Sequence, residues 1–145
     1  MQIVLTQMDV LQLYQLYLTP QNSDLVRRLY VSPCSSMPPV QMAIASHLRS
    51  AAEAELIKSS GTNSLSAIDL IRDADEAFSA LSGLLGEDEC FFGQANPGLF
   101  DASVFAYTHL ILDESLEWKL NELKDALEKY SNLVRHRERI EKMYF

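Results

Sequence analysis

Apolar residues recur at helical spacing along most of the chain, and this pattern restricts the fold more than any other feature. Over residues 64–86 the apolar positions are Ile68, Ile71, Ala74, Phe78, Leu81 and Leu85. The charged side chains of this stretch, Asp69, Arg72, Asp73 and Glu76, fall on the other side of the expected helix. A repeat of three to four residues is typical of an amphipathic helix packed on a core. No segment alternates convincingly as a strand would, so the sequence predicts an all-α fold.

Six or seven helices joined by short connections are expected, which is the usual organisation of a helical bundle. The expected helices cover residues 3–18, a short stretch through 29, a long stretch from Pro38–Pro39 to Gly61, residues 64–86, 99–112, about 114–129 and 131–143. Thr19 precedes a proline, which disfavours the α conformation and ends the first helix. The candidate caps of the next three helices are Asn22 or Ser23, then Ser35 or Ser36, then Ser64. Residues 31–39 should form an ordered loop, and Gly86 should stop the fourth helix.

Two of these helices have a burial pattern that can be tested. The long helix should bury one stripe, made of Val40, Ala43, Ile44, His47, Leu48 and Ala51. Residues 99–112 are apolar nearly all round, which predicts a helix in the middle of the bundle.

Composition excludes several classes of function. The 145 residues suit one compact domain, and 48% of them are apolar, which is enough for a core without metal or disulfide staples. The net charge of −8 is unfavourable for binding nucleic acid or anionic lipid. The first twenty residues lack a positive n-region and are interrupted by Gln2, Gln7, Asp9, Gln12 and Gln15. They therefore predict neither a signal peptide nor a spanning helix.

No pattern of residues points to catalysis, a cofactor or a metal. His47, His109 and His136 fall on three different predicted helices, without ligand spacing, and each is expected at the core edge or the surface. His109 is placed to pair with Asp113 at i,i+4. The two cysteines, Cys34 and Cys90, favour free and mostly buried thiols over one disulfide. We therefore predict no catalytic, cofactor-binding or metal-binding residues.

Two local features are expected to have a structural or binding role. Asp101 stands three residues after Gly98 at a helix start, where its carboxylate can accept the backbone N–H of Gly98. In the last helix, Arg135, Arg139 and Lys142 would form an outer basic stripe. The inward positions of that helix would be Leu133, Ile140, Met143 and Tyr144. The basic stripe is either a solvated helix face or a docking patch for an acidic partner or a lipid head group.

Three motifs resemble the metaxin family. They are the loop Phe91-Phe92-Gly93, the helix start Gly98-Leu99-Phe100-Asp101 with Ala102-Ser103-Val104-Phe105-Ala106-Tyr107, and the tail Tyr130-Ser131-Asn132-Leu133 with Arg139-Ile140-Glu141 and Tyr144-Phe145. The segment from Leu29 to Ser36 looks like the smaller, metaxin-two-like subunit of the fungal mitochondrial sorting and assembly machinery. One departure is that Gly98 replaces the capping Ser or Thr of the family, so only the Asp101 half of the capping box remains.

The resemblance implies a fold and a function. The fold would be the helical bundle of a glutathione-transferase C-terminal domain, with residues 1–145 forming one domain of a longer protein whose N-terminal thioredoxin-like domain is missing here. The function would be that of a non-catalytic, peripheral subunit on the cytosolic face of the mitochondrial outer membrane. Its implied partners are the membrane-embedded barrel-assembly subunit, a second metaxin-type subunit and the β-barrel precursor. Two alternatives remain, the helical half of a glutathione-transferase-like enzyme and a cytosolic helical adaptor.

Overall fold

The protein is entirely helical wherever its structure, a computed structural model, describes it. The backbone is described for residues 2–60 and 66–145, and side chains for residues 8–59 and 66–145. The helices are α1 Gln2–Leu13, α2 Ser23–Val26, α3 Pro38–Ser60, α4 Ala67–Leu85, α5 Leu99–Leu112, α6 Glu122–Leu127 and α7 Ser131–Tyr144. Within the described ranges these seven helices are joined by short helical turns and loops, and no strand occurs. The expected all-α fold class is therefore confirmed.

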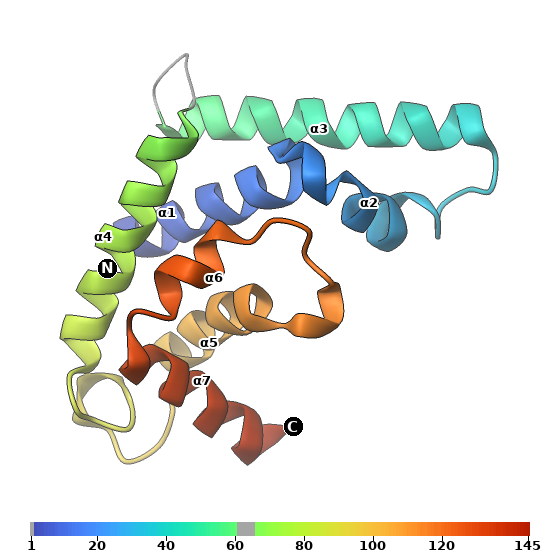
Figure 1. The fold of residues 1–145 in the computed structure, drawn as a ribbon. Coiled ribbons are helices and arrows are strands. Elements are labelled where there is room, and N and C mark those ends of the chain that lie inside the picture. Colours follow the sequence, from blue (N-terminus) through green and yellow to red (C-terminus); the bar gives the residue numbers. More distant parts are fainter. Residues whose placement is uncertain (1, 61–65) are drawn as a thin grey trace.

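The core lies where α4 meets α1, α6 and α7, and it is closed from the other side by α5 (Figure 1). Its largest fully buried apolar side chains are Phe78, Phe91, Met8, Leu56, Leu85, Ile111, Leu127 and Leu133. Residues far apart in the chain thus share one core, since α1 contributes Met8 and α7 contributes Leu133. This single cluster is the main source of stability, because apolar burial is the dominant favourable contribution to folding.

Helix α4 follows its predicted pattern except at its first turn. Ala74, Phe78, Leu81 and Leu85 are buried as expected, and Gly86 ends the helix with φ 58°, a conformation that glycine adopts without a Cβ clash. Ile68 was expected on the same face but is 80% exposed. At 3.6 residues per turn it points about 120° away from Ala74, and Leu70 takes the buried place instead. The expected cap Ser64 lies outside the described residues.

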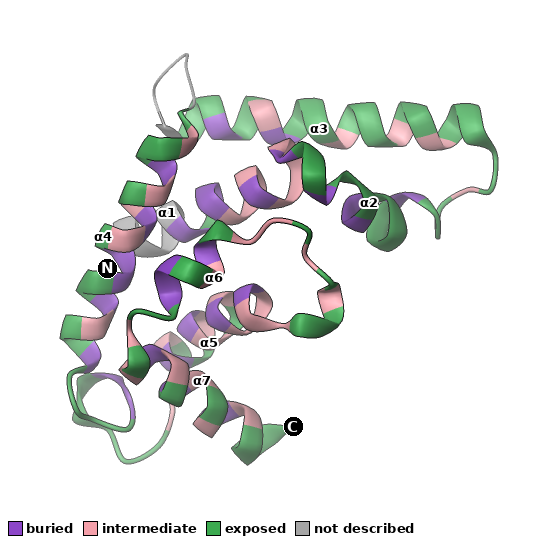
Figure 2. Cartoon of the chain, in the orientation of Figure 1, coloured by how far each residue is buried: buried purple, intermediate pink, exposed green. Residues whose placement is uncertain are grey.

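The predicted buried stripe of α3 is mostly wrong. Val40 is 40% exposed, Ala43, His47 and Ala51 are exposed, and Ile44 and Leu48 are half-buried. Among residues 38–59 of this helix, only Ala52 and Leu56 are buried. The reason is visible in the arrangement: the C-terminal half of α3 packs on α1 and the turn after it, whereas its N-terminal half reaches past α1 and is largely green in the burial colouring (Figures 1 and 2).

The loop before α3 and the start of that helix follow the sequence more closely. Residues 32–37 form the predicted Ser/Pro-rich loop, and Pro38 and Pro39 occupy the first turn of the helix, where a missing N–H costs little. The expected cap is wrong, because neither Ser35 nor Ser36 but Met37 precedes the first helical residue and accepts the N–H of Gln41 at 3.0 Å; the Oγ of Ser35 instead accepts the backbone N–H of Met37 at 3.1 Å. The serine therefore fixes the turn just before the helix.

Helix α5 begins and ends at the predicted residues, but it is not buried all round. Val104, Thr108 and Ile111 face the core, whereas Ala102 and Ala106 are exposed. The apolar composition of α5 therefore predicted more burial than the structure shows.

The single helix expected over about 114–129 does not exist. The chain instead forms a short 3₁₀ turn at Glu114–Leu116, reverses at Glu117 with φ 54°, and enters α6 only at Glu122. Asn121 caps α6 by accepting the backbone N–H of Lys124 at 3.0 Å.

A buried asparagine explains this interruption. Asn22, expected as the cap of a short helix, is fully buried and makes no side-chain cap bond. Its Nδ2 donates to the carbonyls of Gln15 and Leu120, both at 2.9 Å. Its Oδ1 accepts the backbone N–H groups of Lys119 and Leu120, both at 3.1 Å. One side chain thus replaces the hydrogen bonds that a helix would have made here.

Candidate functional site

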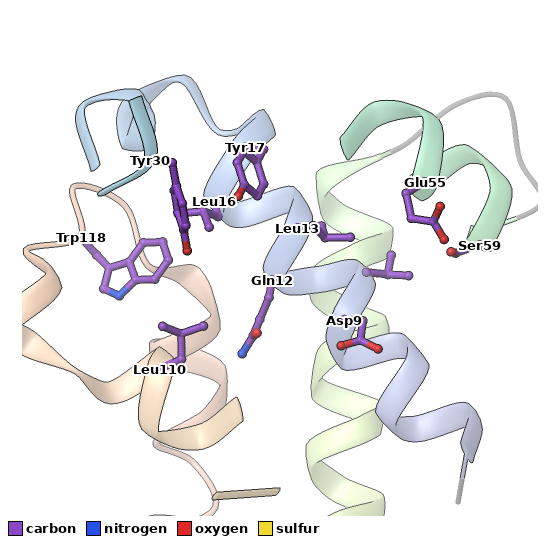
Figure 3. Close-up of a pocket in the computed structure, with 11 residues that line it drawn as sticks. Asp9, Gln12, Leu13, Leu16, Tyr17, Tyr30, Glu55, Ser59, Leu110 and Trp118 are labelled. Atoms are coloured by element: carbon purple, nitrogen blue, oxygen red, sulfur yellow. The ribbon is translucent and has the colours of Figure 1, made fainter. Parts of the chain in front are cut away.

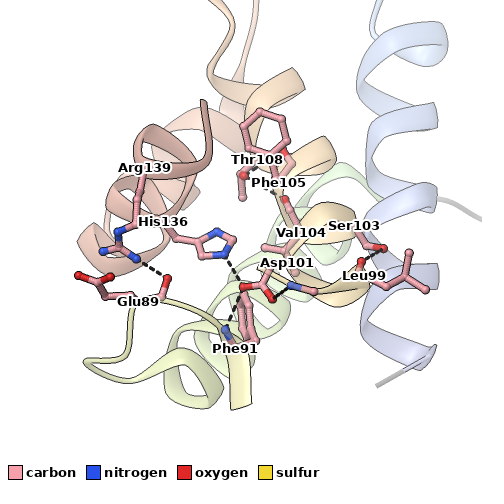
Figure 4. A network of polar contacts seen from close by, with 11 residues as sticks. Glu89, Phe91, Leu99, Asp101, Ser103, Val104, Phe105, Thr108, His136 and Arg139 are labelled. Carbon is pink, nitrogen blue, oxygen red and sulfur yellow. Dashed lines mark hydrogen bonds and ion pairs between the residues drawn. The ribbon is translucent and has the colours of Figure 1, made fainter. Parts of the chain in front are cut away.

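A buried polar junction surrounds Asp101, in the first turn of α5. Its Oδ2 accepts the backbone N–H of Gly98 at 2.9 Å, which is the half of a capping box expected from the sequence. Its Oδ1 accepts the backbone N–H of Phe91 at 2.9 Å and lies 2.9 Å from Nε2 of His136 on α7 (Figure 4). Asp101 therefore joins the 91–93 loop, the start of α5 and the middle of α7.

Burial and hydrogen bonding set the charge state of this pair. Burial alone would raise the pKa of Asp101, but the hydrogen bonds from Gly98, Phe91 and His136 together hold it below its usual value. Because the carboxylate carries no proton, Nε2 of His136 donates to it. Burial lowers the pKa of His136, against the opposing effect of Asp101. The pair is thus a carboxylate bonded to a neutral imidazole over the neutral pH range.

This geometry favours a structural role for the pair. Asp101 is 2% exposed and His136 1% exposed, so bulk solvent and substrates do not reach either side chain. Nδ1 of His136 has no hydrogen-bond partner within the described residues, so no third group orients the ring as in a proton relay. The carboxylate is occupied by three donors, which is what a buried charge needs for stability.

His136 is the residue that reasoning from the sequence missed, since it was expected at the core edge or the surface. A usable signal was present, because Leu133, His136 and Ile140 are spaced as one helix face and all three are buried. A histidine among apolar positions of a stripe needs a partner when it is buried. The partner here, Asp101, lies 35 residues earlier in the chain.

Aromatic rings pack around the same junction. The ring of Phe91 contacts Phe100 edge-on, with centroids 4.8 Å apart, and contacts the His136 ring in the same way at 5.2 Å. The next residue, Phe92, has φ 63° and is 50% exposed. The loop is therefore held at Phe91 while it presents Phe92 to solvent.

The basic stripe predicted on α7 is only partly available for a partner. Arg135 and Lys142 are exposed, and Arg135 reaches back to the carbonyl of Ser131. Arg139 is half-buried, and its guanidinium donates to the carbonyl of Glu89. Two of the three predicted contacts thus face solvent, while Arg139 holds the 87–97 loop against α7.

The end of α7 and the environment of His109 both differ from expectation. Met143 and Tyr144 were expected to face inward but are 53% and 61% exposed, because α7 extends here beyond the core (Figure 2). His109 does not pair with Asp113, whose carboxylate instead accepts the backbone N–H of Ser115 at 2.9 Å. The Nδ1 of His109 lies 3.2 Å from a guanidinium nitrogen of Arg137, and this guanidinium also pairs with Glu141.

The remaining residues that carry chemistry do not assemble into a reactive group. Both cysteines are free thiols, as favoured from the sequence, but the expected burial holds for Cys90 and is wrong for Cys34, which is exposed. Burial raises the pKa of the Cys90 thiol, which opposes formation of the nucleophilic thiolate. In residues 2–60 and 66–145 no three His, Cys, Asp or Glu side chains come together as a metal site would require. No helix in these ranges is long and apolar enough to cross a membrane.

Comparison with known proteins places this geometry in a recognised fold. The family model for the C-terminal domain of glutathione S-transferases matches residues 74–140, which include Asp101 and most of α7. The chain is also 37% identical to metaxin-2 of Mus musculus over 76 residues. The matched segment makes up 52% of the chain and 28% of metaxin-2, so the chain spans less than a third of that relative's length. The chain thus has the all-helical fold of a glutathione-transferase C-terminal domain, and both matches support its similarity to the metaxin and glutathione-transferase-like proteins.

Proposed function

We propose that this protein is a non-catalytic subunit of the mitochondrial outer-membrane sorting and assembly machinery. It would help to recognise and insert β-barrel precursors through protein–protein contacts. It would be held at the cytosolic face by the membrane-embedded barrel-assembly subunit and a second metaxin-type subunit.

One observation carries the proposal, the 37% identity to metaxin-2. The structure adds support for a binding role over catalysis, because the buried ionisable pair of Asp101 and His136 joins three segments and is closed to solvent. The fungal subunit is preferred within the family because of the residues between Leu29 and Ser36.

Two exposed features of α7 and its neighbouring loop are the proposed contacts. Arg135 and Lys142 offer positive charge on a chain of net charge −8, which would steer this face toward an acidic partner. Phe92 is exposed on the 87–97 loop, which Arg139 of α7 contacts at Glu89, and it supplies the aromatic anchor that protein interfaces favour. Arg139 positions this loop through Glu89 and is assigned a supporting role.

The test is a native pull-down of the tagged chain from gently solubilised mitochondrial outer membranes, probed for the barrel-assembly subunit. Co-purification is the expected result. The double variant Arg135→Glu with Lys142→Glu should reduce the recovered subunit several-fold. The matched control is Arg49→Glu with Lys119→Glu, which changes the net charge equally at exposed positions on other elements.

The possible outcomes test the membership of the assembly and the location of the contact surface separately. If the wild-type chain recovers the subunit and both double variants recover it equally, the α7 face is not the contact. If neither this chain nor a version extended at its N-terminus recovers the subunit, the assignment to the sorting and assembly machinery is refuted.

A second candidate follows from the family match over residues 74–140, namely the helical half of a glutathione-transferase-like enzyme. Retention of an N-terminally extended version on immobilised glutathione, with conjugation of an electrophilic substrate, would favour it. A cytosolic adaptor would remain in the soluble fraction after cell fractionation, whereas the proposed subunit should sediment with mitochondria.

A further inference from the structure

A pocket of about 490 Å³ lies on the opposite side of α1 from the buried core contacts of Met8 and Leu11. Its floor is one face of α1 and of the helical turn Tyr14–Leu18 that follows it, formed by Asp9, Gln12, Leu13 and Leu16 at helical spacing. Figure 3 shows Trp118 and Leu110 on one side of this helix and Glu55 on the other. This volume is in the range of sites that bind a small ligand or a side chain of a partner.

The pocket combines aromatic rings with negative charge. Tyr17, Tyr30 and Trp118 line it, and the two tyrosine rings lie 6.1 Å apart between centroids. The carboxylates of Asp9 and Glu55 line it as well, and none of its lining residues is Lys, Arg or His. Aromatic faces attract cations within about 6 Å of the ring centroid, and carboxylates add direct attraction. This composition selects for a positively charged occupant.

Neither carboxylate is neutralised within the pocket. Asp9 accepts a hydrogen bond from the hydroxyl of Tyr107, which leaves its negative charge in place. Glu55 lies 3.5 Å from the ammonium of Lys58, a surface pair with exposed side chains and hence of little energy. An incoming cation would therefore compete with one weak, exposed ion pair.

The Trp118 side chain contributes its ring to the pocket. Its Nε1 is buried and has no hydrogen-bond partner in the described part of the chain, and it has almost no solvent-accessible surface. The aromatic face is therefore the part of Trp118 that an occupant can contact.

The surroundings of the pocket suit a polypeptide better than an isolated small cation. The four floor residues Asp9, Gln12, Leu13 and Leu16 extend for about 10 Å along α1 and the helical turn Tyr14–Leu18 that follows it, at a rise of 1.5 Å per residue. Tyr30 stands at the margin and is 44% exposed, and its neighbour Leu29 is 39% exposed. From Leu29 to Leu48 the sequence contains no Asp, Glu, Lys or Arg. Apolar residues next to the cation would meet Leu29 and Tyr30 at this margin.

We propose that the pocket binds a lysine or arginine side chain presented by an apolar segment of a partner polypeptide. The cation would lie between the aromatic rings and the carboxylates of Asp9 and Glu55. This proposal rests on the pocket alone and does not depend on the outer-membrane assignment.

The experiment uses a reporter that the chain already contains, because Trp118 is its single tryptophan. The complete chain is titrated with a set of acetylated, amidated nonapeptides made of leucine, alanine and glycine. Each peptide contains a single lysine or arginine, and the position of this residue differs from one peptide to the next. Matched peptides carry norleucine in place of the cation. We expect at least one cationic peptide to shift the tryptophan emission saturably, and its norleucine partner to bind about tenfold more weakly.

Two conservative variants assign the binding to this pocket. Glu55→Gln and Tyr30→Leu should each weaken the cationic peptide several-fold and leave the norleucine peptide unchanged. The matched control is Glu53→Gln, on the same helix but outside the pocket, where the carboxylate pairs with Arg49 at 3.2 Å. Far-ultraviolet circular dichroism of each variant checks that the fold is retained.

Three results would overturn the proposal. The first is the absence of a saturable emission change with every cationic peptide up to about 1 mM. The second is equal affinity for the lysine and norleucine peptides, which would make the groove merely apolar. The third is displacement of the bound peptide by free n-butylamine at a similar concentration, which would indicate a site for small amines.

Discussion

The substitution Asp101→Ala tests the account of the buried junction most directly. It removes a side chain that is 2% exposed and accepts three hydrogen bonds, from Gly98, Phe91 and His136. Alanine is compatible with the helical backbone of α5, so the substitution tests the loss of the carboxylate alone. The loop, α5 and α7 would then lose their common anchor at once.

The expected magnitude follows from adding the separate losses. Loss of a helix cap alone costs about 0.5–2 kcal/mol. The N–H of Phe91 and Nε2–H of His136 are also left without an acceptor in a buried site, and each such donor costs about 1–3 kcal/mol. Because water can enter the space left by the carboxylate, the costs do not add fully, and we expect about 3–5 kcal/mol in total.

The assay is urea unfolding at pH 7, followed by circular dichroism, with the midpoint and slope compared with those of the wild-type chain. The matched control is Asp88→Ala, an exposed acidic residue of the neighbouring loop, which should change stability by no more than about 0.5 kcal/mol. An Asp101→Ala cost below about 1 kcal/mol, at unchanged slope, would refute the three-segment junction and reduce Asp101 to an ordinary cap.

Three further predictions concern the same core. Burial keeps the pKa of His136 below its ordinary 6.5, so the unfolded chain binds the proton more readily, and stability should fall as pH drops below about 6.5. The urea midpoint measured between pH 7.5 and 5 should depend less on pH in the His136→Gln variant than in the wild-type chain. An equal pH dependence in both would contradict the lowered pKa of His136. Asn22→Ala removes four hydrogen bonds and should lower the free energy of unfolding by about 2–4 kcal/mol, with faster amide hydrogen exchange across residues 117–121. Exchange as slow as in the wild-type chain would contradict the role of Asn22 in holding this segment. Phe78→Ala should lower the free energy of unfolding, measured in urea, by about 3–5 kcal/mol. Phe105→Ala should lower it by only about 1–2 kcal/mol, because the Phe105 ring is half-buried against His109 and Phe145. Equal losses in the two variants would contradict the burial pattern.

Local signals in the sequence located the helix ends well. Gly98 and Asp101 predicted the start of α5, and the structure shows this helix over Leu99–Leu112. Gly86 predicted the end of α4 for a backbone reason, its positive φ. In both cases the determining interaction lies within four residues along the chain. Such interactions can be read from a sequence, because they do not depend on the position of any other element.

Burial could not be predicted in the same way. An apolar stripe shows which side of a helix can be buried, but another element must be present to cover it. Helix α3 has such a stripe, yet only its C-terminal half lies on α1, and Val40, Ala43 and His47 in the N-terminal half remain exposed (Figure 2). Conversely, the periodic pattern of residues 114–129 was overridden by Asn22, which binds the backbone of Lys119 and Leu120 from 97 and 98 positions away.

Polar residues within an apolar stripe give a rule that would have recovered part of the missing information. Met8, Leu11 and Gln15 are buried at helical spacing on the first helical segment, as Leu133, His136 and Ile140 are on α7. A buried polar side chain is costly unless it is hydrogen-bonded, so its presence in a stripe predicts a partner on another element. Gln15 bonds to Asn121, 106 residues later, and His136 bonds to Asp101. The sequence therefore marks one member of each long-range pair, and only the packing of the helices determines the other.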